Sequence, residues 1–289
     1  MRFLPEGIRR LVYQDDSRDP RRALGDKHAV VVCVCAQKGG VGKTTTAVNV
    51  ASGLSLIHER RVLLIDADAQ GHVLSSLHGE IPDPATNDSL SEVLLARKRD
   101  VCEIVLPTRI EHMYVTPSDK QLSETESVLA GRIGKEFLLR SAIKIARTQY
   151  DFIVVDCPPA IGNLTLNALV ASDWAIIPCD MSVLSLEGVD DMVSTIETVN
   201  ERLSHSLKIM GLLPTRIDKR NVRVNAAIEE GLQSRYGALV FNTSILVATS
   251  LAQANLAGVP IFRHDPTSRG AENYRDLVGE ILSRVQPQA

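Results

Sequence analysis

The feature that most constrains this chain is a glycine-rich loop placed between an apolar run and a helical pattern. The apolar run covers residues 29–36, the loop covers residues 37–43 with the sequence QKGGVGK, and the helical pattern starts at Thr44. Glycines let the backbone turn tightly and point its amide groups at an anion, and the positive end of the following helix strengthens that attraction. This order of strand, loop and helix predicts a phosphate-binding site.

The residues of this loop differ in what they can offer a bound nucleotide. Lys43 can reach the β- and γ-phosphates, and the hydroxyl of Thr44 is placed to bind Mg²⁺. The common form of the motif has glycine at position 37, where this chain has Gln37, and a second lysine, Lys38, follows it. The predicted nucleotide-binding residues in this stretch are Lys38, Gly39, Gly40, Val41, Gly42, Lys43, Thr44 and Thr45.

Carboxylates follow two other apolar runs of the chain. Asp66 and Asp68 come at the end of one run, and Asp156 comes at the end of another. In open α/β folds ligands bind at the carboxyl ends of the strands, so we expect these groups beside the phosphates. Oxygen ligands suit Mg²⁺, and we predict a magnesium site formed by Thr44, Asp156 and Asp68. The thiol of Cys157 is a poor ligand for a hard cation, and we interpret it as core packing.

Short, continuous apolar runs alternate with helical patterns along the rest of the chain. Continuous rather than alternating apolar runs are typical of strands that are buried on both faces. Their alternation with helices predicts an α/β fold with a mainly parallel sheet covered by helices on both faces. The predicted strands are 29–36, 62–65, 152–155, 175–177, 209–213 and 239–241, and the predicted helices are 44–56, 134–147, 186–203, 222–236 and 268–285.

Composition and charge exclude several classes of protein. The five cysteines are odd in number and form no CxxC pair, which argues against a disulfide framework and a tetrahedral zinc site. The formal net charge is −3, so any DNA binding has to come from a local basic surface. No apolar run reaches the roughly 18 residues of a membrane span. We therefore expect a soluble intracellular protein with a flexible tail at residues 1–27 and one folded domain at residues 28–289.

The loop sequence KGGVGKT, the segment Asp66–Gln70 and the sequence DCPP at 156–159 resemble the deviant Walker motifs of the ParA/MinD family, and most of all ParA (Soj-like) partition and positioning proteins. Further similar strings are LEG at 186–188, GVPI at 258–261 and the segment 265–274. The resemblance implies a P-loop NTPase fold, ATP and Mg²⁺ as cofactors, and slow hydrolysis of ATP to ADP and phosphate.

The resemblance also implies a way of working. ATP would join two subunits into a homodimer, the dimer would bind double-stranded DNA without sequence preference, and a ParB-like or cargo-adaptor protein would stimulate hydrolysis. The protein would then be a cytoplasmic, nucleoid-associated switch that segregates or positions DNA or a protein cargo.

Roles for single residues follow from the same resemblance. Lys38 would reach the nucleotide of the other subunit and act in catalysis together with Lys43. Asp68 would orient the attacking water, which makes it the third predicted catalytic residue. Pro214 and Arg216 would border the adenine pocket.

A basic surface is predicted between residues 201 and 223, which contain six basic residues against two acidic ones. A patch of this size would bind DNA phosphates modestly and in a salt-sensitive way, and the alternative is a solvated helix–loop face. Many chromosomal members of the similar family have an arginine before Asn242, where this chain has Phe241. The candidate DNA contacts are Arg202, Lys208, Lys219, Arg220 and Arg223.

Two alternatives to a DNA-bound switch stay open. One is a MinD-like positioning ATPase on a membrane, which would need a basic amphipathic helix at the C-terminus. The apolar residues of 268–285 instead have the spacing of a packed helix face. The other alternative is an ATP-binding scaffold that does not bind DNA.

Overall fold

A central sheet of seven strands organises the part of the chain that the computed structural model describes, residues 28–82, 88–96, 99–182 and 184–285. The strands lie in the order β3-β4-β2-β5-β1-β6-β7, and neighbours run parallel except β3 and β4. This arrangement confirms the predicted α/β fold. The strands are β1 (Val30–Val34), β2 (Val62–Asp66), β3 (Leu106–Pro107), β4 (Met113–Thr116), β5 (Phe152–Asp156), β6 (Trp174–Asp180) and β7 (Lys208–Thr215).

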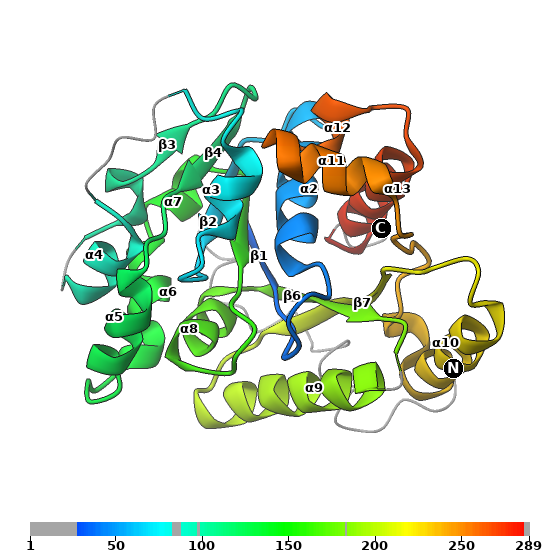
Figure 1. Cartoon of the computed structure of the whole chain (residues 1–289). Coiled ribbons are helices and arrows are strands. Elements are labelled where there is room, and N and C mark those ends of the chain that lie inside the picture. Colours follow the sequence, from blue (N-terminus) through cyan, green and yellow to red (C-terminus); the bar gives the residue numbers. More distant parts are fainter. Residues whose placement is uncertain (1–27, 83–87, 97–98, 183, 286–289) are drawn as a thin grey trace.

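Helices cover both faces of the sheet, as Figure 1 shows. Successive side chains of a strand point to opposite faces, so Val32 packs in one core and Cys33 in the other. The first face carries α2 (Lys43–Leu56), α3 (His72–Leu77), α11 (Thr249–Ala257), α12 (Ile261–His264) and α13 (Arg269–Val285). The second carries α4 (Leu90–Leu95), α5 (Gln121–Leu129), α6 (Leu138–Ala142), α7 (Ala146–Gln149), α8 (Asn163–Ala171), α9 (Leu184–Arg202) and α10 (Val222–Tyr236).

The central strands explain why the sequence shows continuous apolar runs. β2 and β5 are buried along their whole length, and β1 is buried beyond its first residue. A strand that is covered on both faces needs apolar side chains at successive positions. The polar exceptions are Asp66 and Asp156, which end β2 and β5 and pair with each other in register. Both carboxylates therefore lie at one edge of the sheet.

The predicted strand at residues 239–241 is wrong. Residues Gly237–Leu239 form a 3-10 turn, and in the described part of the chain two isolated bridges, Leu212 with Val240 and Ile217 with Leu246, lie beyond β7. The following amides of Asn242 and Thr243 donate to the carboxylate of Glu280 on α13 rather than to a neighbouring strand. The apolar side chains are buried, but the backbone forms no ladder.

The predicted helix at 134–147 is broken into a 3-10 turn (Lys135–Phe137), α6 and α7. The side chain of Asn167 on α8 accepts the N–H of Leu139 and donates to the carbonyl of Lys135. These contacts take backbone groups away from a continuous i to i−4 ladder. The short edge strand β3 and its neighbour β4 were not predicted, and the tail predicted at 1–27 lies outside the described residues.

Candidate functional site

The glycine-rich loop joins β1 to α2 at the carboxyl edge of the sheet. Gly40 (φ +74°) and Gly42 (φ +92°) adopt left-handed backbone conformations, which residues other than glycine rarely adopt. Gly42 is the N-cap of α2, and no side chain of the described residues caps this end. The amide groups that start α2 are therefore available to an anion.

Lys43 is a buried cation at the start of α2, with 7% of its surface exposed. Its ammonium donates a hydrogen bond to the main-chain carbonyl of Lys38, with 3.0 Å between Nζ and O. Burial lowers the pKa of Lys43, and the carboxylates of Asp156 and Asp68 oppose that shift. A desolvated ammonium that rests on a carbonyl can exchange this contact for a phosphate oxygen.

Asp66 and Asp156 are paired in register, yet their oxygens have different surroundings. Asp66 accepts the N–H of Asp68 (3.1 Å) through Oδ1 and the N–H of Val73 (3.2 Å) through Oδ2. Its carboxylate thus holds the turn after β2 and the start of α3. Asp156 is fully buried, and neither of its oxygens has a hydrogen-bond partner among the described residues.

An unpartnered buried carboxylate is unfavourable by itself and suits a site that receives a cation. Burial raises the pKa of Asp156 well above its usual value, and the carboxylate of Asp66 adds to the effect. The Thr44 side chain lies close enough to lower that pKa, and Asp68 close enough to raise it. The structure therefore brings together the three groups predicted to hold Mg²⁺, and their oxygen chemistry fits that ion.

Asp68 lies in a turn that the backbone and two carboxylates fix. Its Oδ1 accepts the N–H of Gln70 at 3.0 Å, and its main-chain carbonyl accepts the N–H of Gly71 at 3.1 Å. The residue is 7% exposed. The role of Asp66 in this turn was missed at the sequence level. An aspartate whose side chain can bond the amide two residues on was the available signal.

The end of β7 supports the glycine loop from the side. The hydroxyl of Thr215 donates to the carbonyl of Val41 (2.8 Å), and the guanidinium of Arg216 donates to the carbonyl of Gly40 (2.7 Å). Arg216 is exposed and has a left-handed backbone (φ +54°), whereas Pro214 is buried in the strand. Of the two residues predicted at the adenine pocket, Arg216 thus contacts the glycine loop. Thr215 was missed because nothing in the sequence marks a hydroxyl that reaches another segment.

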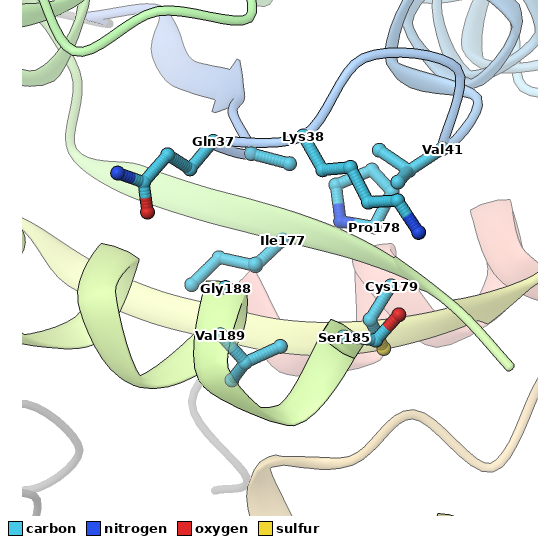
Figure 2. Close-up of a pocket in the computed structure, with 10 residues that line it drawn as sticks. Gln37, Lys38, Val41, Ile177, Pro178, Cys179, Ser185, Gly188 and Val189 are labelled. Atoms are coloured by element: carbon cyan, nitrogen blue, oxygen red, sulfur yellow. The ribbon is translucent and has the colours of Figure 1, made fainter. Parts of the chain in front are cut away.

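The ammonium of Lys38 forms its hydrogen bonds outside its own glycine loop. It donates to Asp180 at the end of β6 and to Ser182 in the turn that follows. A pocket lies beside it, between the loop, β6 and the first turns of α9. Figure 2 shows Lys38, Val41, Pro178, Gly188 and Val189 around this pocket.

The five candidate DNA contacts are split between two edges of the sheet. Lys208 starts β7, and seven steps of about 3.3 Å place it on the order of 23 Å from Thr215. Arg202 ends α9, and the chain then turns and enters β7 at Lys208. We call Arg202 and Lys208 the distal pair. The ammonium of Lys208 lies 5.4 Å from the centroid of the Trp174 ring.

The other three, Lys219, Arg220 and Arg223, lie beyond the opposite end of β7 and are exposed; we call them the loop cluster. Arg220 forms a close ion pair with Asp218, with 2.6 Å between Nη2 and Oδ2. Arg223 lies in the first turn of α10, and Lys219 and Arg220 precede that helix. The loop cluster therefore shares an edge with the glycine loop, and the distal pair does not.

The buried thiols pack in the second core. Cys33, Cys35, Cys157 and Cys179 are each at most 2% exposed. No set of three or more His, Cys, Asp or Glu side chains in the described parts of the chain is arranged to hold a metal ion. The carboxylate of Asp66 is occupied by backbone amides, which leaves Asp68 and Asp156 as carboxylate ligands for Mg²⁺. Thr44 and a bound phosphate would have to supply further ligands.

Comparisons with known proteins cover nearly the whole chain. Residues 29–209 match the family model of an AAA domain. The chromosome partitioning protein ParA of Myxococcus xanthus is 37% identical over 259 residues, which cover 90% of this chain and 90% of that protein. The sporulation initiation inhibitor protein Soj of Bacillus subtilis is 38% identical over 253 residues, which cover 88% and 98%. A solved structure of a cobyrinic acid a,c-diamide synthase from Mycobacterium smegmatis, with bound ATP analogue and magnesium, is 31% identical, covers 90% of this chain and 96% of its own, and has a TM-score of 0.77.

Proposed function

The chain belongs to the ParA family of P-loop ATPases, and on that premise we propose that it is an ATP-driven switch that segregates or positions DNA or a protein cargo. In this proposal ATP joins two copies into a dimer, and the dimer binds double-stranded DNA without sequence preference. The observation that carries the proposal is the buried, unpartnered carboxylate of Asp156 beside Lys43 and Thr44. These groups meet at the N-terminus of α2, where a nucleotide with Mg²⁺ would supply the partner that Asp156 lacks.

The proposed reaction is hydrolysis of ATP to ADP and phosphate, which depends on positioning and charge neutralisation. The loop amides and Lys43 would bind the phosphates, and Thr44 and Asp156 would hold Mg²⁺. When bound, that ion neutralises charge on the phosphate oxygens. Asp68 has Oδ1 engaged with Gln70, and we assign the orientation of the attacking water to Oδ2.

Dimer formation is assigned to Lys38. Its side chain is 41% exposed and its ammonium is bound to Asp180, so we expect it to cross to a second subunit once this contact is broken. A positive charge supplied in this way to the γ-phosphate would resemble an arginine finger, which can raise hydrolysis by about 10³–10⁵. We expect slow turnover in the absence of a partner, because the nucleotide state is the output of the switch.

DNA binding is assigned to the loop cluster rather than to the distal pair. The loop cluster lies at the edge where two nucleotide sites would face each other, so dimerisation would bring two copies of it close together. Each neutralised phosphate releases counterions, which makes such binding sensitive to salt and easy to reverse. Arg202 and Lys208 lie at the opposite edge and would face away from that surface.

The stimulating partner is proposed to be a ParB-like or cargo-adaptor protein, and the location to be the cytoplasm, on the nucleoid. Support comes from the relatives named chromosome partitioning protein and Soj, whose identities exceed 35% over most of the chain. The cargo itself is proposed only at the level of DNA or a protein assembly.

The membrane alternative finds less support in the described structure. The apolar residues of α13, among them Tyr274, Leu277 and Ile281, are buried in the core that α2 shares. Among the helices that the structure describes, none is long and apolar enough to cross a bilayer. An anchor on α13 would have to unpack this core.

Phosphate release from Mg–ATP tests the proposed function, with duplex DNA or anionic vesicles present in separate reactions. We expect slow hydrolysis that Asp68→Ala abolishes, and co-sedimentation of the ATP state with DNA but not with vesicles. The absence of hydrolysis would favour a scaffold. Co-sedimentation with vesicles alone would favour the membrane alternative.

A further inference from the structure

The side chain of Lys38 is held within its own subunit by a network at the end of β6. Its Nζ lies 3.1 Å and 2.9 Å from the two carboxylate oxygens of Asp180 and 3.1 Å from the hydroxyl of Ser182. Figure 2 shows Lys38 extended past Pro178, toward the side where Ser185 lies. All three donors of one ammonium can be used by these acceptors.

Asp180 is fixed for this contact by its neighbours. The hydroxyls of Ser182 and Ser185 both donate to its Oδ1. Its side chain is 22% exposed, and hydrogen bonds from Ser185, Lys38 and Ser182 keep its pKa below the usual value against the effect of burial. The carboxylate is thus a charged, oriented acceptor opposite the glycine loop.

The loop connects this contact to the nucleotide site. Lys43 donates to the main-chain carbonyl of Lys38, and among the described residues this is the one hydrogen bond of the Lys43 ammonium. A phosphate that takes over this ammonium would remove a contact that holds the backbone of Lys38. Nucleotide binding and release of the Lys38 side chain would then act on the same residue.

We propose that Asp180 is a positioning residue that holds Lys38 against its own subunit until a nucleotide-bound partner is present. This inference rests on the proposed function, because it needs Lys38 to act in the second subunit. One ammonium cannot keep both oxygens of Asp180 and Ser182 and also reach across a dimer interface. Each subunit therefore has to break its Lys38–Asp180 pair when the dimer forms. The free energy of this pair raises the concentrations of nucleotide and protein at which the dimer forms.

The size of the effect follows from exposure. One partly exposed ion pair shifts an equilibrium by only a few fold, and two such pairs are broken in each dimer. We expect Asp180→Asn to lower the dissociation constant of the dimer by about tenfold. Asparagine has no charge but nearly the same shape as aspartate. The turn that follows β6 should therefore keep most of its hydrogen bonds.

Analytical ultracentrifugation of the full chain with Mg²⁺ and a non-hydrolysable ATP analogue measures this constant. We expect tighter dimers for Asp180→Asn and values within about threefold of wild type for Asp180→Glu, which keeps a carboxylate. Glu272→Gln is the matched control, because Glu272 forms an exposed ion pair with Arg269 on α13, away from the loop. It should leave the constant unchanged.

A double-mutant cycle in urea, without nucleotide, reads the same pair in the monomer. Lys38→Gln and Asp180→Asn should be coupled by about threefold or more in the folding equilibrium constant. A dimer constant for Asp180→Asn that is unchanged or weaker, with a wild type that dimerises, overturns this inference alone, as does a cycle without coupling. A wild type that stays monomeric with the analogue overturns the proposed function and this inference together.

Discussion

The nucleotide site and the basic segment 202–223 are both rich in charged residues, but the charges are buried at the site and mostly exposed in the segment. At the site, Lys43, Asp66 and Asp156 are at most 7% exposed, and hydrogen bonds fix the positions of Lys43 and Asp66. In the basic segment, Arg202, Lys219, Arg220 and Arg223 are exposed. A buried charge is costly unless a partner compensates it, whereas an exposed charge is already compensated by water. Burial therefore shows which charges await a ligand, and a count of surface charges does not.

The largest effect is expected for Asp156, whose carboxylate is buried without a hydrogen-bond partner among the described residues. Asp156→Asn should reduce ATP hydrolysis by about 100-fold or more, comparable to the loss of one preorganised charge-stabilising group. The same change should stabilise the protein without nucleotide by about 1–3 kcal/mol, because it removes a buried carboxylate that lacks a partner. Phosphate release and urea unfolding measure the two effects. A variant that is less stable than wild type would break the contrast between the two regions.

This gain in stability should depend on pH. Burial raises the pKa of Asp156, so the unfolded chain loses this proton at lower pH than the folded protein does. Wild type therefore loses stability as the pH rises from about 4 toward the folded pKa, and Asp156→Asn does not share that loss. Urea midpoints at pH 5 and pH 8 should show a larger advantage for the variant at pH 8. As the exposed control, Asp276→Asn on α13 should leave the midpoint unchanged at both pH values.

The second prediction divides the basic segment. Replacing Lys219 and Arg223 by alanine together should weaken binding of the ATP state to duplex DNA by on the order of tenfold or more and reduce the salt dependence by about two phosphate contacts. Replacing Arg202 and Lys208 together should change neither quantity. Titrations in a salt series measure both. A loss of affinity in the second variant would mean that the DNA surface follows α9 instead.

The third prediction tests whether Arg220 is engaged by Asp218 at the expense of DNA. Their ion pair uses two guanidinium nitrogens on both carboxylate oxygens. Asp218→Ala removes a negative charge from the loop cluster and frees Arg220, so affinity for DNA should rise about two- to fivefold. An unchanged affinity, measured by the same titration, would show that Arg220 does not reach the phosphates.

The fourth and smallest effect lies where the two regions meet, at Arg216. Its left-handed backbone disfavours residues with a side chain, so Arg216→Gly should be more stable than Arg216→Ala by about 1 kcal/mol. Both variants lose the guanidinium on the Gly40 carbonyl and should bind nucleotide a few fold more weakly. Urea unfolding and titration with a fluorescent ATP analogue separate the two effects. Equal stability of the two variants would contradict the role given to the backbone.

What the sequence predicted and what it missed follow the same division. The glycine loop could be recognised because its strand, turn and helix are contiguous, and the central strands could be found because burial on both faces leaves continuous apolar runs. The support from Thr215 depends on a contact between distant segments. The broken helix at 134–147 likewise depends on Asn167, which belongs to another helix. The turn after β2 is local, and its signal, an aspartate that binds the amide two residues on, was overlooked. The split of the basic segment depends on the length of β7, which charge counting ignores.

The measurement that tests the account most directly is fluorescence anisotropy of labelled duplex DNA with the Asp68→Ala variant, in ATP and in ADP, across a salt series. We predict binding that requires ATP, weakens steeply with salt and disappears when Lys38→Ala is added. Equal binding in ATP and ADP, or no binding while the ATP dimer forms, would contradict a DNA-bound switch controlled by nucleotide.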